Sequence, residues 1–192
     1  MMECDKHLYT TGGDPTVLHR RLLGAGGYGE VHEAQDSIIY ANRQMYDIPL
    51  CKVPTTFRPA FIRQSFARKL IRIPRVEAKV IDTEIRVLTE LSREGIHPHI
   101  VAVLRIGELP NSQDLFIDME LCDLNLAEYI YGSKPRDLVP TFFIKDQSPP
   151  MKASQVWTVM LQLAKGVEYL HRKAIIHRDL KPANGNCCIG LN

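Results

Sequence analysis

The sequence predicts an α+β fold in which a small antiparallel sheet is followed by helices. Residues 16–31 contain glycines at 24, 26 and 29 between segments that lack a helical face, which indicates two strands joined by a flexible turn. Apolar residues recur at helical spacing from 77 to 91, and again over a longer stretch from 154 to 172. The first part of the chain is therefore expected to be built on a sheet and the second part on helices.

The composition is that of an ordinary soluble globular chain. It has 192 residues, of which 45% are hydrophobic and 24% are charged, with a formal net charge of +2. This charge does not indicate a nucleic-acid partner, and no apolar run is long enough to span a bilayer. Five cysteines at irregular spacing predict reduced thiols and an intracellular protein, in the cytoplasm or the nucleus. The oligomeric state stays open.

Residues 1–15 are expected to form a loose leader before the glycine-rich turn. The spacing of that turn is G-x-G-x-x-G, which dinucleotide-binding folds also show. A dinucleotide site needs a helix that opens at the glycines, whereas residues 30–34 have no helical face. Backbone N–H groups at such a turn can lie over nucleotide phosphates, because no side chain keeps the phosphates away. A plain glycine hairpin is the alternative.

The middle of the chain is expected to complete the sheet and to add one helix. Prolines at 49, 54 and 59 predict an insertion over residues 35–64. Residues 65–71 are typical of a third strand. The helix predicted over residues 77–91 has an apolar face of Ile81, Ile85 and Leu88, and Glu84 lies near this face.

The remaining elements follow from the same patterns. Strands are expected at residues 101–106 and 115–121, a short helix at 124–131 and a proline-rich loop at 132–150. Ser154 is expected to cap a long helix that ends near Arg172. The buried stripe of that helix would consist of Val156, Met160, Leu163, Val167 and Leu170.

The stretch with the most specific chemistry follows this helix and runs His177-Arg178-Asp179-Leu180-Lys181-Pro182-Ala183-Asn184. It is polar and contains a proline, so it is expected to be a structured loop. Asp179 can accept the proton of an attacking hydroxyl, and Lys181 can reach a transferring phosphoryl group. Asn184 can offer its carbonyl oxygen to Mg²⁺, which prefers oxygen ligands. The alternative is a solvated polar turn.

This stretch resembles the catalytic loop of protein kinases, H-R-D-x-x-x-x-N, and its lysine resembles the serine/threonine branch. Other stretches resemble the family in the same order along the chain. They are the glycine-rich turn, Phe66-Ala67-Arg68-Lys69 for the V-A-I-K strand, the Glu84 segment for the αC helix, and Met119-Glu120-Leu121-Cys122 for the hinge. The amino-acid sequences of residues 30–33, 66–69 and 119–123 are similar to those of fungal serine/threonine kinases, whose chains are longer.

The resemblance implies a kinase N-lobe, an antiparallel sheet plus the αC helix, with only the first helices of the C-lobe. The N-lobe and hinge would span residues 16–122 and the partial C-lobe residues 123–184. Residues 185–192 have no counterpart in the family, and Gly185 and Asn186 stand where kinases place apolar residues. Only eight residues follow Asn184, where the family continues with the Asp-Phe-Gly segment, the activation loop and the substrate-binding helices.

The resemblance also implies ATP and Mg²⁺ as ligands. Asp179 would be the catalytic base, with Lys181 and Asn184 beside it and Asn184 as a magnesium ligand. Lys69 would pair with the phosphates and Glu84 would fix Lys69. Asp123 or Asn125 would meet the ribose. The implied nucleotide-binding residues are Leu23, Gly24, Ala25, Gly26, Gly27, Tyr28, Gly29, Val31, Ala67, Lys69, Glu84, Met119, Glu120 and Cys122.

Two functional classes follow from these expectations. The first is a protein serine/threonine kinase, an incomplete copy that would act on a protein substrate only if the chain were completed and would be inactive as 192 residues. The second is a catalytically inactive nucleotide-binding or regulatory kinase fragment, produced by a misread frame or a retained intron. A dinucleotide-dependent enzyme ranks behind both, because the helix after Gly29 is missing.

Overall fold

The computed structural model describes residues 8–26, 29–36, 65–72, 78–93, 95–132 and 143–187. The chain divides into two compact units. The first consists of residues 1–96 and 102–121, and the second of residues 97–101 and 122–192. None of the helices in the described ranges is long and apolar enough to cross a membrane.

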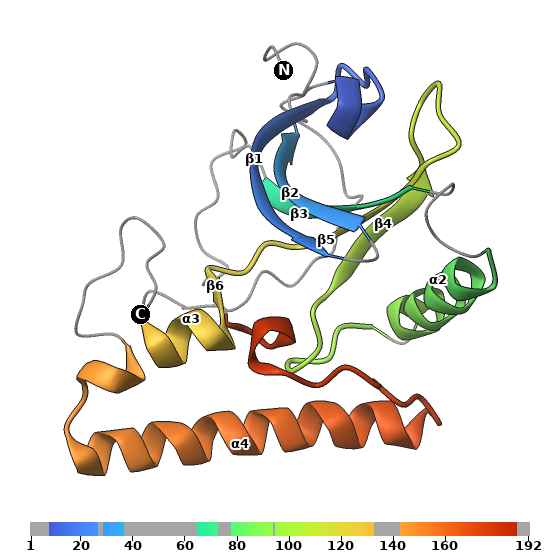
Figure 1. Cartoon of the computed structure of the whole chain (residues 1–192). Coiled ribbons are helices and arrows are strands. Elements are labelled where there is room, and N and C mark those ends of the chain that lie inside the picture. The colour runs from blue at the N-terminus through green and yellow to red at the C-terminus, as the bar shows by residue number, and fades with distance from the viewer. Residues whose placement is uncertain are drawn as a thin grey trace, which may run out of the picture. The chain divides into compact units, whose positions relative to one another are not determined.

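The first unit is built on a five-stranded antiparallel sheet with the strand order β1-β2-β3-β5-β4 (Figure 1). Its strands are β1 (Val17–Gly26), β2 (Gly29–Asp36), β3 (Ser65–Ile71), β4 (Val103–Glu108) and β5 (Leu115–Glu120). The predicted antiparallel sheet is therefore confirmed. The strand β2 continues two residues into the segment that we expected to be an insertion, because Gln35 pairs with Leu18 and Asp36 with Val17. The rest of that segment, residues 37–64, lies outside the described residues.

Both faces of the sheet are packed. On one side, Val17, Ala34 and Phe66 form a buried cluster. On the other side, the helix α2 (Ala78–Arg93) lies beside the sheet (Figure 1). It forms the second cluster, in which Ile81 packs with Ile71 and Ile117. The side chains of α2 that add to this cluster are the ones the spacing predicted, Ile85 and Leu88.

Part of the expected leader is packed rather than loose. Residues 8–11 form a helical turn, and Thr10 and Thr11 are fully buried. The guanidinium of Arg72 lies 3.8 Å from the centre of the Tyr9 ring and donates to the Tyr9 carbonyl at 2.9 Å. A side chain at Gly12 would collide with the backbone of Pro110, so glycine is required where this turn meets the β4–β5 connection. Residues 1–7 lie outside the described residues.

The second unit begins with a short paired strand and a capped helix. The strand β6 (Leu124–Asn125) pairs with β7 (Asn186–Cys187), so the first residues after the expected end of the family pattern are ordered. The helix α3 (Leu126–Tyr131) is capped at its first turn, because the side chain of Asn125 accepts from the Glu128 N–H and the Glu128 side chain accepts from the Asn125 N–H. The 3₁₀ turns η3 (Ile144–Asp146) and η4 (Pro182–Asn184) flank the long helix in sequence.

The long helix α4 (Pro149–Arg172) starts earlier than predicted, with Ser148 rather than Ser154 at its N-cap. Two prolines open it, because a first turn does not need their missing N–H groups. The predicted buried stripe is also wrong. Leu170 is buried, whereas Val156 and Met160 are 47% and 55% exposed, because none of the described elements of the second unit covers that side.

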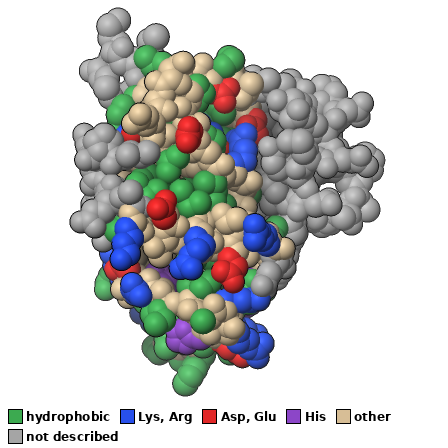
Figure 2. All heavy atoms as spheres, turned by 90° about the vertical axis from the view of Figure 1, so that its right-hand side faces the viewer, with side chains coloured by type: hydrophobic (Ala, Val, Ile, Leu, Met, Phe, Trp, Pro, Cys, Tyr) green, Lys and Arg blue, Asp and Glu red, His purple; other side chains and the backbone are tan. Residues whose placement is uncertain are grey.

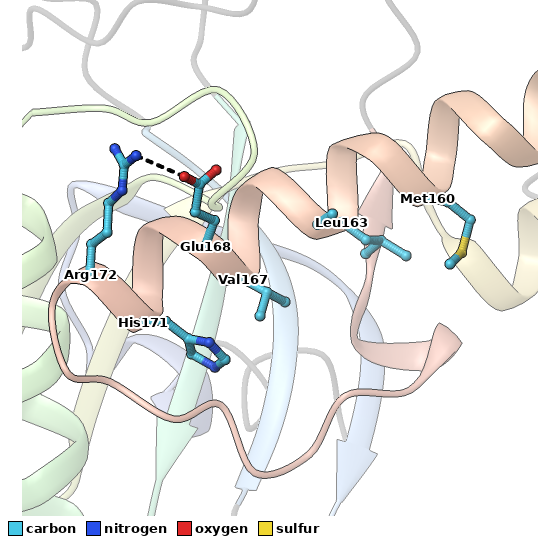
Figure 3. A pocket seen from close by; sticks show the side chains of 7 residues that line it. Met160, Leu163, Val167, Glu168, His171 and Arg172 are labelled. Atoms are coloured by element: carbon cyan, nitrogen blue, oxygen red, sulfur yellow. Dashed lines mark ion pairs between the residues drawn. The ribbon is translucent and has the colours of Figure 1, made fainter.

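The exposed side of α4 forms a shallow apolar groove (Figure 3). The side chains of Met160, Leu163 and Val167 project from α4 and line this groove, and His171 lies one helical turn further on. The ion pair between Glu168 and Arg172 lies at one end of the groove. The other side of α4 is occupied, because His97 stacks on Tyr169 with ring centres 4.3 Å apart.

Charges of both signs are interspersed with apolar side chains on the face that Figure 2 shows. The described residues on this face therefore gather into no large patch of one sign.

The glycines of the β1–β2 hairpin differ in what their backbone requires. Gly29 has φ +143°, and a side chain there would collide with the carbonyl oxygen of Leu70 on β3. A side chain at Gly24 or Gly26 would meet nothing within 4 Å. The hairpin therefore needs glycine at position 29 in order to close. The glycines at 24 and 26 are not required for space, and they leave the backbone of β1 uncovered by side chains.

This difference predicts that Gly29→Ala destabilises the chain and that Gly24→Ala does not. A side chain in a strained backbone region costs about 1–3 kcal/mol, and the contact with Leu70 adds to this cost. Gly24→Ala is the matched control and is expected to change the free energy of unfolding by less than ~0.5 kcal/mol. Urea unfolding of both variants measures the difference. Equal effects would show that the backbone at Gly29 is not the constraint.

Candidate functional site

The most specific contact in the first unit joins β3 to α2. Nζ of Lys69 lies 2.5 Å from Oε1 of Glu84, and both side chains are partly exposed. The contact depends on the packing of Ile81 against the sheet, because this packing sets which face of α2 meets β3. The sequence predicted this pair, and the structure contains it. The role of the pair toward a nucleotide stays a prediction.

The residues expected around the nucleotide share one face of the sheet. Val31 is the register partner of both Gly24 and Lys69, and Ala67 is the partner of Met119. Directly opposed residues of antiparallel strands lie on the same face, as do residues two apart on one strand. The structure therefore brings Val31, Ala67, Lys69 and Met119 together. Gly24 adds backbone without a side chain at the end of this row.

The other residues predicted to contact nucleotide are placed less specifically. Leu23, Ala25 and Gly26 lie on the exposed end of β1. Gly27 and Tyr28 lie outside the described residues. The backbone N–H of Glu120 donates to the carbonyl of Ala102 at 2.9 Å, so that N–H is engaged within the sheet unit. Cys122 is half-buried and forms no disulfide with any described cysteine.

Asn125 has a structural role that was not among the sequence-based predictions. Its side chain caps α3, with Oδ1 accepting the Glu128 N–H at 3.0 Å. An asparagine three residues before a glutamate is a signal for such a cap, and this signal was available in the sequence. The structure thus assigns Asn125 a structural contact, whereas the resemblance to protein kinases implies that Asp123 or Asn125 meets the ribose.

In the second unit, the loop after α4 is organised around Asp179. The side-chain amide nitrogen of Asn184 donates at 2.8 Å to both the carbonyl and the carboxylate of Asp179. Nζ of Lys181 lies 2.8 Å from the same carboxylate. The backbone N–H of Asp179 donates to Nδ1 of His177 at 3.3 Å. The stretch is therefore a structured loop that is held by its own side chains and ends in the turn η4.

These contacts act on the charge of Asp179. The hydrogen bond from Lys181 lowers the pKa of the Asp179 carboxyl, and the hydrogen bond from Asn184 lowers it further. The side chain is more than half exposed, so water and a substrate hydroxyl can reach it. An accessible carboxylate that is ionised at neutral pH can orient a hydroxyl and accept its proton.

The loop offers a cation fewer ligands than a dedicated metal site. Among the residues that the structure describes, no group of three or more His, Cys, Asp or Glu side chains is arranged to hold a metal ion. The carbonyl oxygen of Asn184 takes no part in the two bonds made by its amide nitrogen. Mg²⁺ keeps several waters and binds through few protein oxygens plus substrate phosphates. Asn184 therefore fits as one ligand of an ion that a nucleotide would otherwise hold.

Comparison with known proteins adds independent information. The protein kinase domain family matches residues 60–185, which is more than half of the 192 residues. A calcium/calmodulin-dependent protein kinase kinase from Caenorhabditis elegans is 27% identical over 168 residues, covering 84% of this chain and 27% of that protein.

Two further relatives agree with this match. The serine/threonine-protein kinase STK11 of Gallus gallus is 29% identical over 163 residues, which are 85% of this chain and 29% of that protein. Cyclin-dependent kinase 10 of Mus musculus is 31% identical over 162 residues, which are 84% of this chain and 34% of that protein. The chain thus spans about a third or less of the length of these relatives. The match over residues 60–185 includes Lys69, Glu84 and the Asp179 loop, and it shows that the chain belongs to the protein kinase domain family.

Proposed function

We propose that the chain carries the nucleotide-binding face and the catalytic loop of an ATP-dependent serine/threonine protein kinase. The observation that carries the proposal is the contact of Lys69 with Glu84, which holds an ammonium group on the same sheet face as Val31, Ala67 and Met119. Apolar side chains beside a fixed positive charge suit the flat base and the phosphates of a nucleotide. The names of the relatives support the serine/threonine class.

Each of the chain's own residues has a defined part in this proposal. Lys69 binds the nucleotide phosphates, and Glu84 keeps its side chain from turning away. Asp179 orients the attacking hydroxyl and accepts its proton at the carboxylate, and Lys181 meets the transferring phosphoryl group. Magnesium, when bound with ATP, supplies the positive charge that neutralises the phosphates. Asn184 keeps the loop folded around Asp179 and offers its carbonyl oxygen to that ion.

A nucleotide-binding regulatory fragment is the second candidate. It is favoured by the small set of ligands that the described residues offer a metal ion and by the exposed side of α4. We also propose that the protein lies inside the cell, in the cytoplasm or the nucleus, and that it is related to fungal kinases. The irregular spacing of the five cysteines supports the location.

The first test is nucleotide binding. The 192-residue chain is expected to bind Mg-ATP, and Lys69→Met is expected to weaken binding about 10- to 100-fold, which corresponds to a lost hydrogen bond to a charged group. Lys79→Met, on the exposed side of α2, is the matched control and should bind as the unaltered chain does. Isothermal titration calorimetry measures all three. The absence of binding by the unaltered chain would refute both candidate functions.

A phosphate-transfer assay distinguishes the two candidate functions. The same protein is incubated with labelled ATP and a generic protein substrate. A working kinase transfers phosphate to serine or threonine and loses this activity in Asp179→Asn, by about 10²–10⁴-fold. A regulatory fragment binds the nucleotide and transfers nothing in either form.

A second prediction concerns the electrostatics of Asp179. Removal of the ammonium group in Lys181→Met should raise the pKa of the Asp179 carboxyl toward its ordinary value, because the largest cause of its lowering is lost. The remaining bond from Asn184 should keep the pKa somewhat low. A ¹³C NMR titration of the carboxyl measures the shift, with the exposed Lys165→Met as control. An unchanged titration in Lys181→Met would show that the contact with Lys181 does not form in solution.

A further inference from the structure

The sequence of β3 does not by itself specify which side of the strand faces which layer. From 66 to 71 it reads two apolar residues, two basic residues and two apolar residues. One face carries Phe66, Arg68 and Leu70, and the other carries Ala67, Lys69 and Ile71. Both faces therefore hold two apolar side chains and one basic one. The alternation that normally sets the register of a strand is absent, and a slip of one residue would exchange Arg68 with Lys69.

The neighbouring strand β5 distinguishes the two basic residues. Asp118 is fully buried on β5, and its register partner on β3 is Arg68. Nε and Nη2 of Arg68 donate to the two carboxylate oxygens of Asp118 at 2.7 and 2.9 Å. In a register that slipped by one residue, Lys69 would lie opposite Asp118 instead. The two registers thus compete for the same buried carboxylate.

The buried site suits arginine better than lysine. The planar guanidinium makes two parallel hydrogen bonds to one carboxylate, whereas an ammonium group is a point charge without this fork. The guanidinium of Arg68 also lies 4.2 Å from the centre of the Phe116 ring and 5.5 Å from that of Phe66. A lysine cannot stack and make the fork at the same time, so the native register is favoured.

The same carboxylate connects further strands. Arg105 on β4 donates through Nε to Asp118 at 2.9 Å and through Nη2 to Asp36 on β2 at 3.3 Å. With Arg68, these contacts cross the four adjacent strands β2, β3, β5 and β4 on the face opposite Lys69. Asp118 is the central member of this network, because it accepts from both arginines.

We propose that Arg68 and Asp118 are positioning residues that set the register of β3 and thereby hold Lys69 against Glu84. A slip of one residue carries Lys69 to the other face of the sheet, and a slip of two moves it by about 7 Å along the strand. Either slip removes the contact between Lys69 and Glu84. Buried ion pairs add little net stability, and their best-attested use is to specify register. Only the consequence for nucleotide binding rests on the proposed function.

The test separates register from stability. In Arg68→Met, Asp118 keeps Arg105, and Lys69 becomes the only basic side chain of β3 that can approach it. In the double variant Arg68→Leu/Asp118→Leu, both members of the buried pair are removed together, and Arg105 keeps its contact with Asp36. The control is Arg21→Gln/Glu33→Gln, which removes the exposed pair between β1 and β2. Backbone NOEs report the register, since they join Lys69 to Ile117 in the native pairing and to position 118 after a slip of one residue.

The unaltered chain and the control are expected to show one set of cross-strand NOEs. Arg68→Met should show the slipped set. The double variant should unfold at the same temperature as the unaltered chain or higher. It should nevertheless show two sets of NOEs, one native and one slipped, because the carboxylate for which the two registers compete is gone. A merely structural pair predicts the opposite, a single native set with only the unfolding temperature changed. A single native set in either folded variant would overturn the proposal, and Arg68→Met decides it alone if the double variant does not fold.

Mg-ATP titration of the same samples provides a separate readout. If the unaltered chain binds nucleotide, both register variants should bind at least about 10-fold more weakly, because Lys69 leaves its position. If the unaltered chain does not bind, the proposed function fails, while the NOEs still decide whether Arg68 and Asp118 set the register.

Discussion

The pairing of β3 with β2 on one side and with β5 on the other is the constraint on which the rest of the first unit depends. It places Lys69 on the face that α2 covers, and it aligns Val31, Ala67 and Met119 with that lysine. The packing of Ile81 on the sheet then brings Glu84 to Lys69. Had β3 paired one residue out of register, Ala67 and Lys69 would lie on the opposite face from Val31 and Met119. The chemistry of the sheet face is therefore a consequence of strand register.

The loop around Asp179 follows a different principle, because its order is local. The bonds from Asn184 and Lys181 to Asp179 span five residues or fewer. The bonds that lower the pKa of Asp179 therefore come from within this loop. The sheet face has to be assembled from four strands and a helix, whereas the contacts around Asp179 join residues of one short stretch.

The exposed side of α4 shows that helical periodicity alone does not predict burial. The apolar spacing of Met160, Leu163 and Val167 is real, and these residues lie on one side of the helix as predicted. Periodicity shows which residues share a side, but not whether another element covers that side. Among the described elements of the second unit, none does so.

The sequence by itself determined the elements whose signals are local. These are the third strand over residues 65–71, the helix that carries Glu84, the glycine hairpin and the polar loop with Asp179 at its centre. Only the tertiary structure decided how distant side chains meet, as with Arg72 on Tyr9 and Arg68 on Asp118. The physical reason is that strand propensity and helical spacing act over a few residues, while a register between strands 50 residues apart is selected by whichever buried charges find partners.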